Sequence, residues 1–129
     1  MPVIYQKRIC RDDLRRNPNA VYLFGDNEAR TGLGGQAREM RGEPNAFGIA
    51  TKKSPYEFWS DCEYFRNIQV INSDYSKIYL QKAPNKILVV PSDGIGTGLA
   101  ELKIRAPYTF DYLQDQMKNL IEFVWKRGI

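Results

Sequence analysis

The chain has 129 residues, of which 43% are hydrophobic and 26% are charged, and its formal net charge is +4. This is ordinary globular composition, and the length predicts a single domain over residues 1–129. Because the sequence contains no histidine, it lacks the commonest general base and the commonest transition-metal ligand, which excludes zinc hydrolases and Ser-His-Asp hydrolases. We expect neither a metal nor a cofactor.

The sequence carries no membrane signal. No stretch approaches the ~20 apolar residues that span a bilayer, and charges occupy the N-terminal segment where a signal peptide has its apolar core. We expect a cytoplasmic protein without a membrane partner. Apart from a cluster of arginines at positions 8, 11, 15 and 16 and the tail Lys126-Arg127, the basic residues are scattered. That pattern is more typical of a solvated surface than of a nucleic-acid interface, so a nucleic-acid partner is disfavoured.

The first half of the chain predicts three short strands and two short helices. Apolar runs that are bounded by turn residues, or that alternate with polar residues, predict strands at Val3–Lys7, Val21–Phe24 and Ala46–Thr51. The segments between them predict helices at Asp12–Arg16, which a turn cluster ends, and at Gly35–Arg41.

The second half predicts two strands and three helices. Pro55–Arg66 predicts a helix, Asn67–Ile71 a strand, and a segment capped by Asn72 or Ser73 a further helix. Lys86–Pro91 is the clearest buried strand of the chain, and the last segment is the clearest helix. An apolar stripe at spacings of three and four marks that helix: Leu113, Met117, Leu120, Ile121 and Val124.

Strands that alternate with helices in this way are typical of an α/β protein. We therefore expect a three-layer α/β/α domain with a mixed, mainly parallel sheet.

A glycine-rich loop follows the second predicted strand. The strand runs into Gly25-Asp26-Asn27, and Gly32-Leu33-Gly34-Gly35 then leads to a helix start. Glycines let a backbone approach an anion closely, and the N–H groups at a helix N-terminus point at negative charge. A tight turn that requires positive φ is the alternative. The residues we interpret as a phosphate cradle are Gly25, Gly32, Gly34, Gly35 and Gln36.

A second glycine-rich loop follows the strand at Lys86–Pro91. Its glycines stand at alternate positions and hydroxyl donors accompany them, an arrangement suited to clamping a diphosphate. In a parallel sheet both loops lie at the same edge and face one cleft. The residues predicted to bind the ligand here are Ser92, Asp93, Gly94, Ile95, Gly96, Thr97 and Gly98.

The two loops together resemble the macro domain, a family of ADP-ribose-binding modules. In that family an apolar strand ends in a segment that closes with Asn, and a glycine run follows five residues on. A later strand that ends in Pro precedes a loop of the type Ile-Gly-Thr-Gly. Here Asn27 precedes Gly32-Leu33-Gly34-Gly35, and Val89-Val90-Pro91 precedes Ile95-Gly96-Thr97-Gly98. The resemblance covers roughly residues 20–115.

This resemblance implies a macro-like fold that binds ADP-ribose or a related NAD-derived nucleotide. Gly34 and Gly35 would lie beneath the distal ribose, and the loop from Gly94 to Gly98 would wrap the diphosphate. Asn27 would hold that ribose or, with Asp26 as the base candidate, a water that attacks an ADP-ribosyl bond. Hydrolytic members of one large class carry Asp soon after the first glycine run. Here those positions are Gln36, Ala37 and Arg38, none of which is acidic, and this slightly favours binding without turnover.

Two other functions stay open from the sequence. Pro91–Glu101 is also similar to the Pro-Gly-Gly-x-Gly-Thr-x-x-Glu loop of lysine-decarboxylase-like phosphoribohydrolases, in which Glu101 would take the acidic position. A non-catalytic nucleic-acid-binding protein that uses the basic N-terminal segment is the other.

Two groups of side chains also have open roles. Arg30 and Arg41 are either forked phosphate donors or solvated side chains. The aromatic residues near Tyr56 and Trp59 either stack on a base or pack in the core or a lid.

Overall fold

A parallel sheet forms the centre of the structure, a computed structural model that describes residues 3–126. The strands β1 (Val3–Gln6), β2 (Ala20–Asp26), β3 (Ala46–Ala50) and β4 (Ile87–Pro91) lie in the order β1-β4-β2-β3. β2 and β4 occupy the centre, since they are almost wholly apolar and almost wholly buried. Every pairing of these strands is parallel, so all four carboxyl ends lie at one edge of the sheet.

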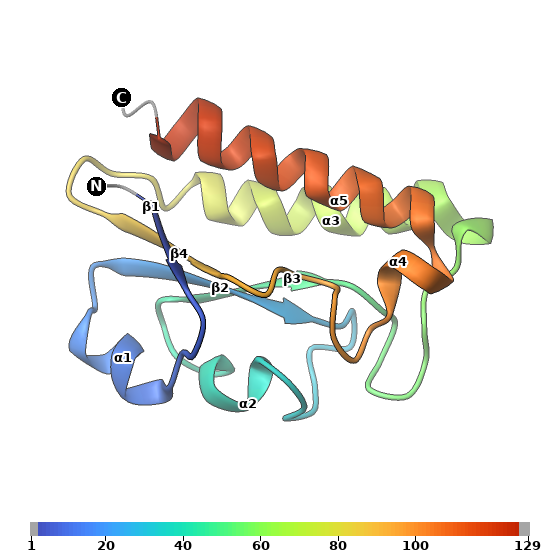
Figure 1. Ribbon diagram of the computed structural model, residues 1–129, viewed down its shortest axis with the longest axis horizontal. Coiled ribbons are helices and arrows are strands. Elements are labelled where there is room, and N and C mark those ends of the chain that lie inside the picture. The colour runs from blue at the N-terminus through green and yellow to red at the C-terminus, as the bar shows by residue number, and fades with distance from the viewer. Residues whose placement is uncertain (1–2, 127–129) are drawn as a thin grey trace.

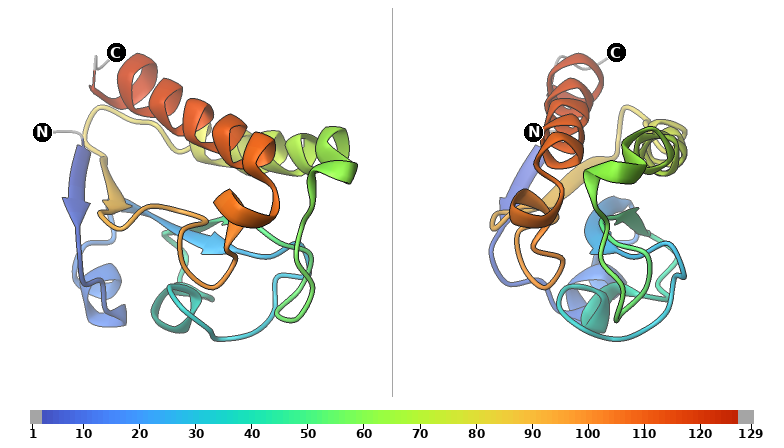
Figure 2. Two further views of the ribbon diagram at one scale, coloured as in Figure 1. Left: turned by 45° about the vertical axis from the view of Figure 1, so that its right-hand side comes forward. Right: turned by 90° about the vertical axis from the view of Figure 1, so that its right-hand side faces the viewer.

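Helices cover both faces of this sheet (Figures 1 and 2). The long helices α3 (Tyr64–Tyr79) and α5 (Pro107–Leu120) lie side by side on one face. The short helices α1 (Arg11–Arg16) and α2 (Ala37–Met40) lie on the other. The α/β class and the three-layer α/β/α arrangement are therefore confirmed. The sheet of the described residues is wholly parallel, where some antiparallel pairing was expected.

Local sequence signals explain where several helices begin. Acidic residues in the first turn of α1 and basic residues in its last turn complement the helix dipole. Pro107 begins α5, which follows the one-turn helix α4 (Leu102–Arg105) and continues as a π-helical segment, η2 (Ile121–Lys126). The carboxylate of Asp61 caps α5 from outside, because it accepts hydrogen bonds from two N–H groups of the first turn at 2.9 and 3.0 Å.

Alternation along β2 divides the core into two clusters. Val21 and Leu23 pack in the larger cluster with α3 and α5, whereas Tyr22 and Phe24 pack in the smaller one with α1 and α2. Each fully buried large side chain contributes roughly 1.5–3 kcal/mol. The apolar stripe predicted for the last helix is confirmed in the larger cluster, where its members are buried or partly buried: Leu113, Met117, Leu120, Ile121 and Val124.

Helix α3 contradicts two sequence-based expectations. The strand expected at Asn67–Ile71 is wrong, and so is the helix start expected at Asn72 or Ser73, because all these residues lie inside α3. Residues 67, 71, 75 and 78 are buried and recur with a helical period, so one continuous face of α3 packs on the sheet.

The helix expected at Pro55–Arg66 is wrong over its first half. Residues 55–60 form an irregular loop, and a 3₁₀ turn, η1 (Asp61–Glu63), precedes α3. Tertiary contacts override the local pattern here. Trp59 is buried in the larger core cluster, and Pro55 packs closely on the loop after β2.

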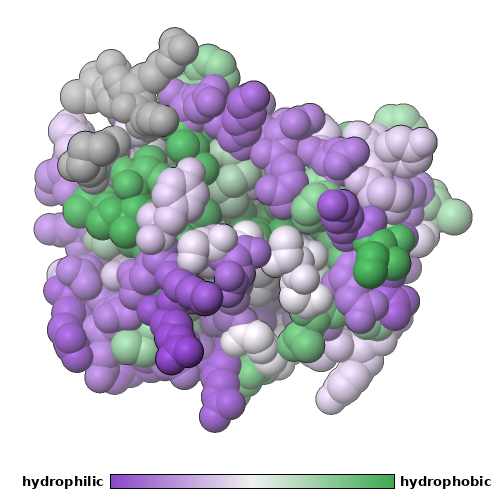
Figure 3. Space-filling model, in the orientation of Figure 1, coloured by the Kyte–Doolittle hydropathy of each residue, from purple (hydrophilic) through white to green (hydrophobic). Residues whose placement is uncertain are grey.

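The surface over α1 and α2 is mainly hydrophilic, whereas hydrophobic residues gather over the beginning of β1 (Figure 3). On α1, Arg11 and Arg15 contact Glu43 at 2.6 and 3.4 Å, and Arg16 lies 3.9 Å from Asp12. The hydrogen bond from Arg11 is the main reason why the pKa of Glu43 is lowered. Such pairs are typical of a solvated surface. Within residues 3–126, no helix combines the length and the apolar character that a membrane span requires.

Gly48 on β3 leaves the space that the Asp26 side chain occupies. A Cβ at position 48 would lie 2.6 Å from Asp26 Oδ2 and 2.8 Å from Asp26 Cβ. We expect Gly48→Ala to lower the free energy of unfolding by about 1–3 kcal/mol, since the carboxylate must move within a packed interior.

Urea unfolding measures this change. Gly98→Ala is the matched control, because a Cβ at Gly98 meets nothing within 4 Å, and its midpoint should stay near that of the unsubstituted protein. Equal midpoints for the two variants would contradict the assigned role of Gly48.

Candidate functional site

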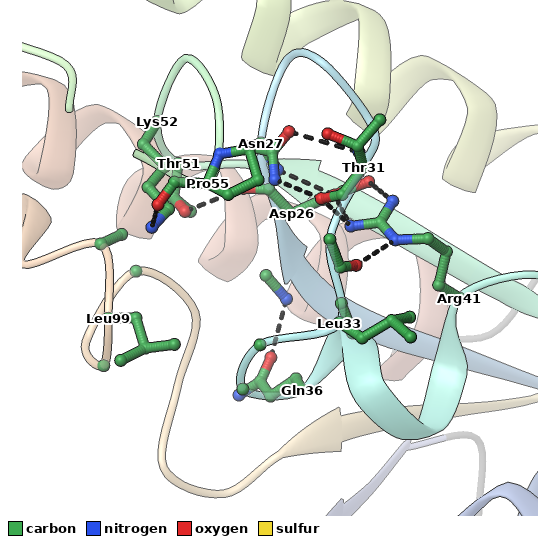
Figure 4. Close-up of a pocket in the computed structure, with 18 of the residues that line it drawn as sticks. Asp26, Asn27, Thr31, Leu33, Gln36, Arg41, Thr51, Lys52, Pro55 and Leu99 are labelled. Carbon is green, nitrogen blue, oxygen red and sulfur yellow. Dashed lines mark hydrogen bonds and ion pairs between the residues drawn. The ribbon is translucent and has the colours of Figure 1, made fainter. Parts of the chain in front are cut away.

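The loops that follow β2, β3 and β4 surround one cleft at the carboxyl edge of the sheet (Figure 4). Its volume is about 400 Å³, within the range of small-molecule sites. The two glycine-rich loops thus face one cleft, as the sequence predicted. The predicted site residues that line it are Gly25, Asp26, Asn27, Gly32, Gly34, Gly35, Gln36, Gly94, Gly96 and Gly98.

The other predicted binding residues do not line the cleft. Ile95 is buried in the larger core cluster. Ser92 and Asp93 are exposed outside the cleft, and the Thr97 hydroxyl donates to the Asp93 carbonyl oxygen at 2.7 Å. Glu101, the acidic residue of the phosphoribohydrolase alternative, also lies outside the cleft, and its carboxylate pairs with an arginine of α4 at 3.1 Å.

Glycines of the first loop let the two neighbouring loops come into contact with it. Gly32 has a φ of +86°, a conformation that L side chains rarely adopt. A Cβ at Gly32 would lie 2.9 Å from Pro55 Cγ, and a Cβ at Gly34 would lie 3.1 Å from Leu99 Cδ1. Pro55 and Leu99 therefore rest on glycine backbone, and the three loops form one continuous wall.

Gln36 joins the two glycine-rich loops directly. Its Oε1 accepts a hydrogen bond of 2.7 Å from the Gly25 N–H, and its Nε2 donates one of 3.0 Å to the Gly94 carbonyl oxygen. In Figure 4 the Gln36 side chain lies between Leu99 and Leu33. A single side chain thus links the end of β2 to the loop after β4.

A network of four charged side chains lies behind the cleft. Asp26 Oδ1 and Oδ2 accept hydrogen bonds from Arg41 at 2.6 and 3.2 Å, and Arg30 reaches Oδ2 at 3.5 Å. Arg30 also binds Asp74 at 2.6 Å, and Asp74 accepts the Ala50 N–H at 2.8 Å. Both aspartates are buried, and a buried carboxylate is stable only when it is paired in this way. The network closes the end of β3 against α3 and the first glycine loop.

This network bears on the predicted roles of its members. Both carboxylate oxygens of Asp26 accept hydrogen bonds from arginine side chains. The carboxylate therefore has a structural role, separate from the predicted role as a base. Arg41 lines the cleft but is bound to Asp26, and Arg30 does not line it.

Asn27 closes the turn that begins the first loop. Its Nδ2 donates to the Thr31 carbonyl oxygen at 2.9 Å, and its Oδ1 accepts the Thr31 N–H at 3.5 Å. The residue is buried and still lines the cleft. The oxygen and the nitrogen of its side-chain amide therefore both already form hydrogen bonds within the protein.

The loop after β3 supplies four further cleft residues, of which only Tyr56 has a role suggested by the sequence, as part of the aromatic segment. Thr51, Lys52, Pro55 and Tyr56 all line the cleft. Lys52 Nζ donates to the Pro55 carbonyl oxygen at 3.0 Å and lies 5.2 Å from the Phe58 ring centroid. Among residues 3–126, no carboxylate lies within ion-pair distance of Lys52. The rule that ligands bind at the carboxyl ends of parallel strands was the signal that could have found this loop.

Glu28 attaches the first loop to α3. Its carboxylate accepts hydrogen bonds from Trp59 at 2.6 Å and from Arg66 at 2.6 and 2.7 Å. Burial by itself would raise the pKa of Glu28, but the hydrogen bonds from Arg66 and Trp59 outweigh burial, and the pKa is lowered.

Comparison with known proteins identifies a family. The model of a family of unknown function, DUF7831, matches residues 4–116. The chain belongs to this family. Every residue that lines the cleft lies inside the matched segment. No curated protein and no solved structure matches the chain.

We expect Gln36→Glu to lower the free energy of unfolding by about 1–3 kcal/mol, because a carboxylate cannot donate to the Gly94 carbonyl oxygen and leaves it facing a negative charge. Chemical denaturation tests this. Gln116→Glu on α5 makes the same chemical change where the described residues offer the side chain no hydrogen bond, and it should have little effect. An equal loss in both variants would argue against the bridge.

A pH dependence follows from the lowered pKa of Glu28. The folded state stabilises the ionised carboxylate of Glu28. Its contribution to the free energy of unfolding is therefore complete above the pKa of the unfolded state, about 4.3, and is lost as the pH falls through the lower pKa of the folded state. Glu28→Gln should therefore be less stable than the parent at pH 7, and the difference should shrink as the pH is lowered towards 3.

Thermal unfolding across that pH range measures the difference. The matched control is Asp111→Asn, which changes an exposed carboxylate outside the ion pairs of the described residues. A Glu28→Gln difference that is independent of pH would contradict the assigned ion pair.

Proposed function

We propose that this chain binds a phosphate-bearing nucleotide, ADP-ribose or a related NAD-derived molecule, in the cleft between its two glycine-rich loops. One observation carries the proposal. The loops after β2 and β4 are 58 residues apart at Gln36 and Gly94, yet they converge on a single cleft at the carboxyl edge of a parallel sheet. This is the place where open α/β sheets bind ligands.

The electrostatics of the cleft support an anionic ligand. Its lining includes three charged side chains, those of Asp26, Arg41 and Lys52. Asp26 and Arg41 neutralise each other, whereas the ammonium group of Lys52 contacts only a carbonyl oxygen and an aromatic ring among the described residues. A positive charge and glycine backbone without Cβ atoms together suit a phosphate group.

The side-chain contacts favour binding without turnover. Asn27 and Asp26, which the resemblance to macro domains would place at an attacking water, already bond within the protein. Turnover of an ADP-ribosyl bond would require at least one of these contacts to open. We therefore propose a binding function first. A product assay decides whether the protein also hydrolyses an ADP-ribosyl bond.

Gly98→Leu tests the cleft without straining the loop. Gly98 lines the cleft, its φ is outside the left-handed region, and a Cβ there meets nothing within 4 Å. A leucine side chain should therefore fill ligand space in a folded protein. In isothermal titration calorimetry with ADP-ribose, we expect micromolar binding by the parent and at least about tenfold weaker binding by Gly98→Leu.

Ser73→Leu is the matched control, since it adds the same side chain at an exposed position of α3 and should bind like the parent. Mass spectrometry then tests for turnover. A protein that only binds leaves both ADP-ribose and an ADP-ribosylated substrate, incubated in a parallel sample, unchanged. A hydrolase releases product from the ADP-ribosylated substrate. No heat with ADP-ribose, or equal binding by Gly98→Leu and Ser73→Leu, would overturn the proposal.

A further inference from the structure

Apolar side chains from three separate loops form the rim of the cleft. Leu33 and Leu99 are each 64% exposed, and Tyr56 is 91% exposed. They come from the loops after β2, β4 and β3 respectively, and Pro55 joins them in the lining. A single exposed leucine needs no explanation, but apolar groups that gather at one cleft indicate a surface that a ligand covers. We call Leu33, Pro55, Tyr56 and Leu99 together the apolar rim.

The polar side chains of the cleft are mostly occupied by the protein. The amides of Asn27 and Gln36 bond to backbone groups, and the Thr51 hydroxyl donates to the Asp26 carbonyl oxygen at 3.0 Å. Asp26 and Arg41 bind each other. Each amide and carboxylate side chain among the described lining residues therefore already has a hydrogen-bond partner within the protein.

Two hydroxyl groups remain for a ligand. Neither Thr31 Oγ1 nor Tyr56 Oη has a hydrogen bond within the described part of the chain, and both residues line the cleft. A hydroxyl group both donates and accepts hydrogen bonds. It therefore does not distinguish the amino edge of adenine from the keto edge of guanine or uracil.

We propose that the apolar rim holds the base of the ligand by packing against its ring, so the cleft accepts nucleoside diphosphates with little regard to the base. Aromatic packing tolerates every base, because every base has a π-face. Selectivity then lies in the phosphates, which the glycine-rich loops and the Lys52 ammonium group hold. This inference rests on the proposed function and defines the class of ligand that the same cleft accepts.

The test compares ligands that share the diphosphate and differ in the base. Isothermal titration calorimetry with ADP, GDP and UDP should give dissociation constants within about fivefold of one another, because ring packing is tolerant of sequence. Ribose 5-phosphate, which is AMP without its base, should bind at least about tenfold more weakly than AMP, since the contact with the rim is lost while the phosphate is the same.

Variants of Tyr56 test the ring itself. Tyr56→Ala should weaken ADP, GDP and UDP by a similar factor of about tenfold, and Tyr56→Phe should restore the binding of all three. Tyr108→Ala is the matched control, since Tyr108 is 72% exposed and lies outside the lining. Tyr56 is almost fully exposed, so these variants should keep the melting temperature of the parent.

Each outcome distinguishes the inference from the proposed function. A preference for one base above about fivefold, or unchanged binding in Tyr56→Ala, overturns the inference while ADP-ribose binding stands. Failure of Tyr56→Phe to restore binding also overturns it, because the hydroxyl group rather than the ring would then make the contact. If the parent binds neither ADP-ribose nor any of the diphosphates, the proposed function fails and the inference fails with it.

Discussion

The buried carboxylate of Asp26 is the constraint around which the cleft is arranged. A carboxylate at the end of a central strand is costly to bury alone, and its partner has to come from elsewhere in the chain. Arg41 lies 15 residues further on, so the intervening loop must turn back over the end of β2. Gly48 leaves room for the carboxylate on the neighbouring strand. Arg30 links the same group to Asp74 on α3. The first glycine-rich loop is therefore held at its base by charge.

Packing and hydrogen bonding then attach the other loops to this base. Pro55 and Leu99 rest on the backbone of Gly32 and Gly34, and Gln36 spans from the end of β2 to the loop after β4. Glycines at such positions serve two purposes. They permit close contact between loops, and they leave backbone N–H groups accessible to a ligand. The contacts at Gly32 and Gly34 thus give the glycine run a structural role apart from the proposed phosphate binding.

The cleft combines a polar floor with an apolar rim, and these parts suit different portions of a nucleotide. The floor holds glycine backbone, and one wall holds the unneutralised charge of Lys52, whereas the rim presents Leu33, Tyr56 and Leu99 to solvent. A ligand with a charged diphosphate and a flat apolar ring matches this division. The DUF7831 match spans all of these residues.

The sequence by itself determined the α/β class, the four strands and the convergence of two glycine-rich loops, because apolar runs and glycine spacing are local signals. The sequence-based prediction was wrong for α3. Its buried residues recur with a helical period in a mostly polar segment, but the sequence pattern predicted a short strand at Asn67–Ile71. It also missed Lys52 as a residue that lines the cleft. Only tertiary structure decided that Asp26 and Asn27 bond within the protein and that Ile95 packs in the core. Such roles depend on which distant residues pack together, and spacing along one chain does not encode that.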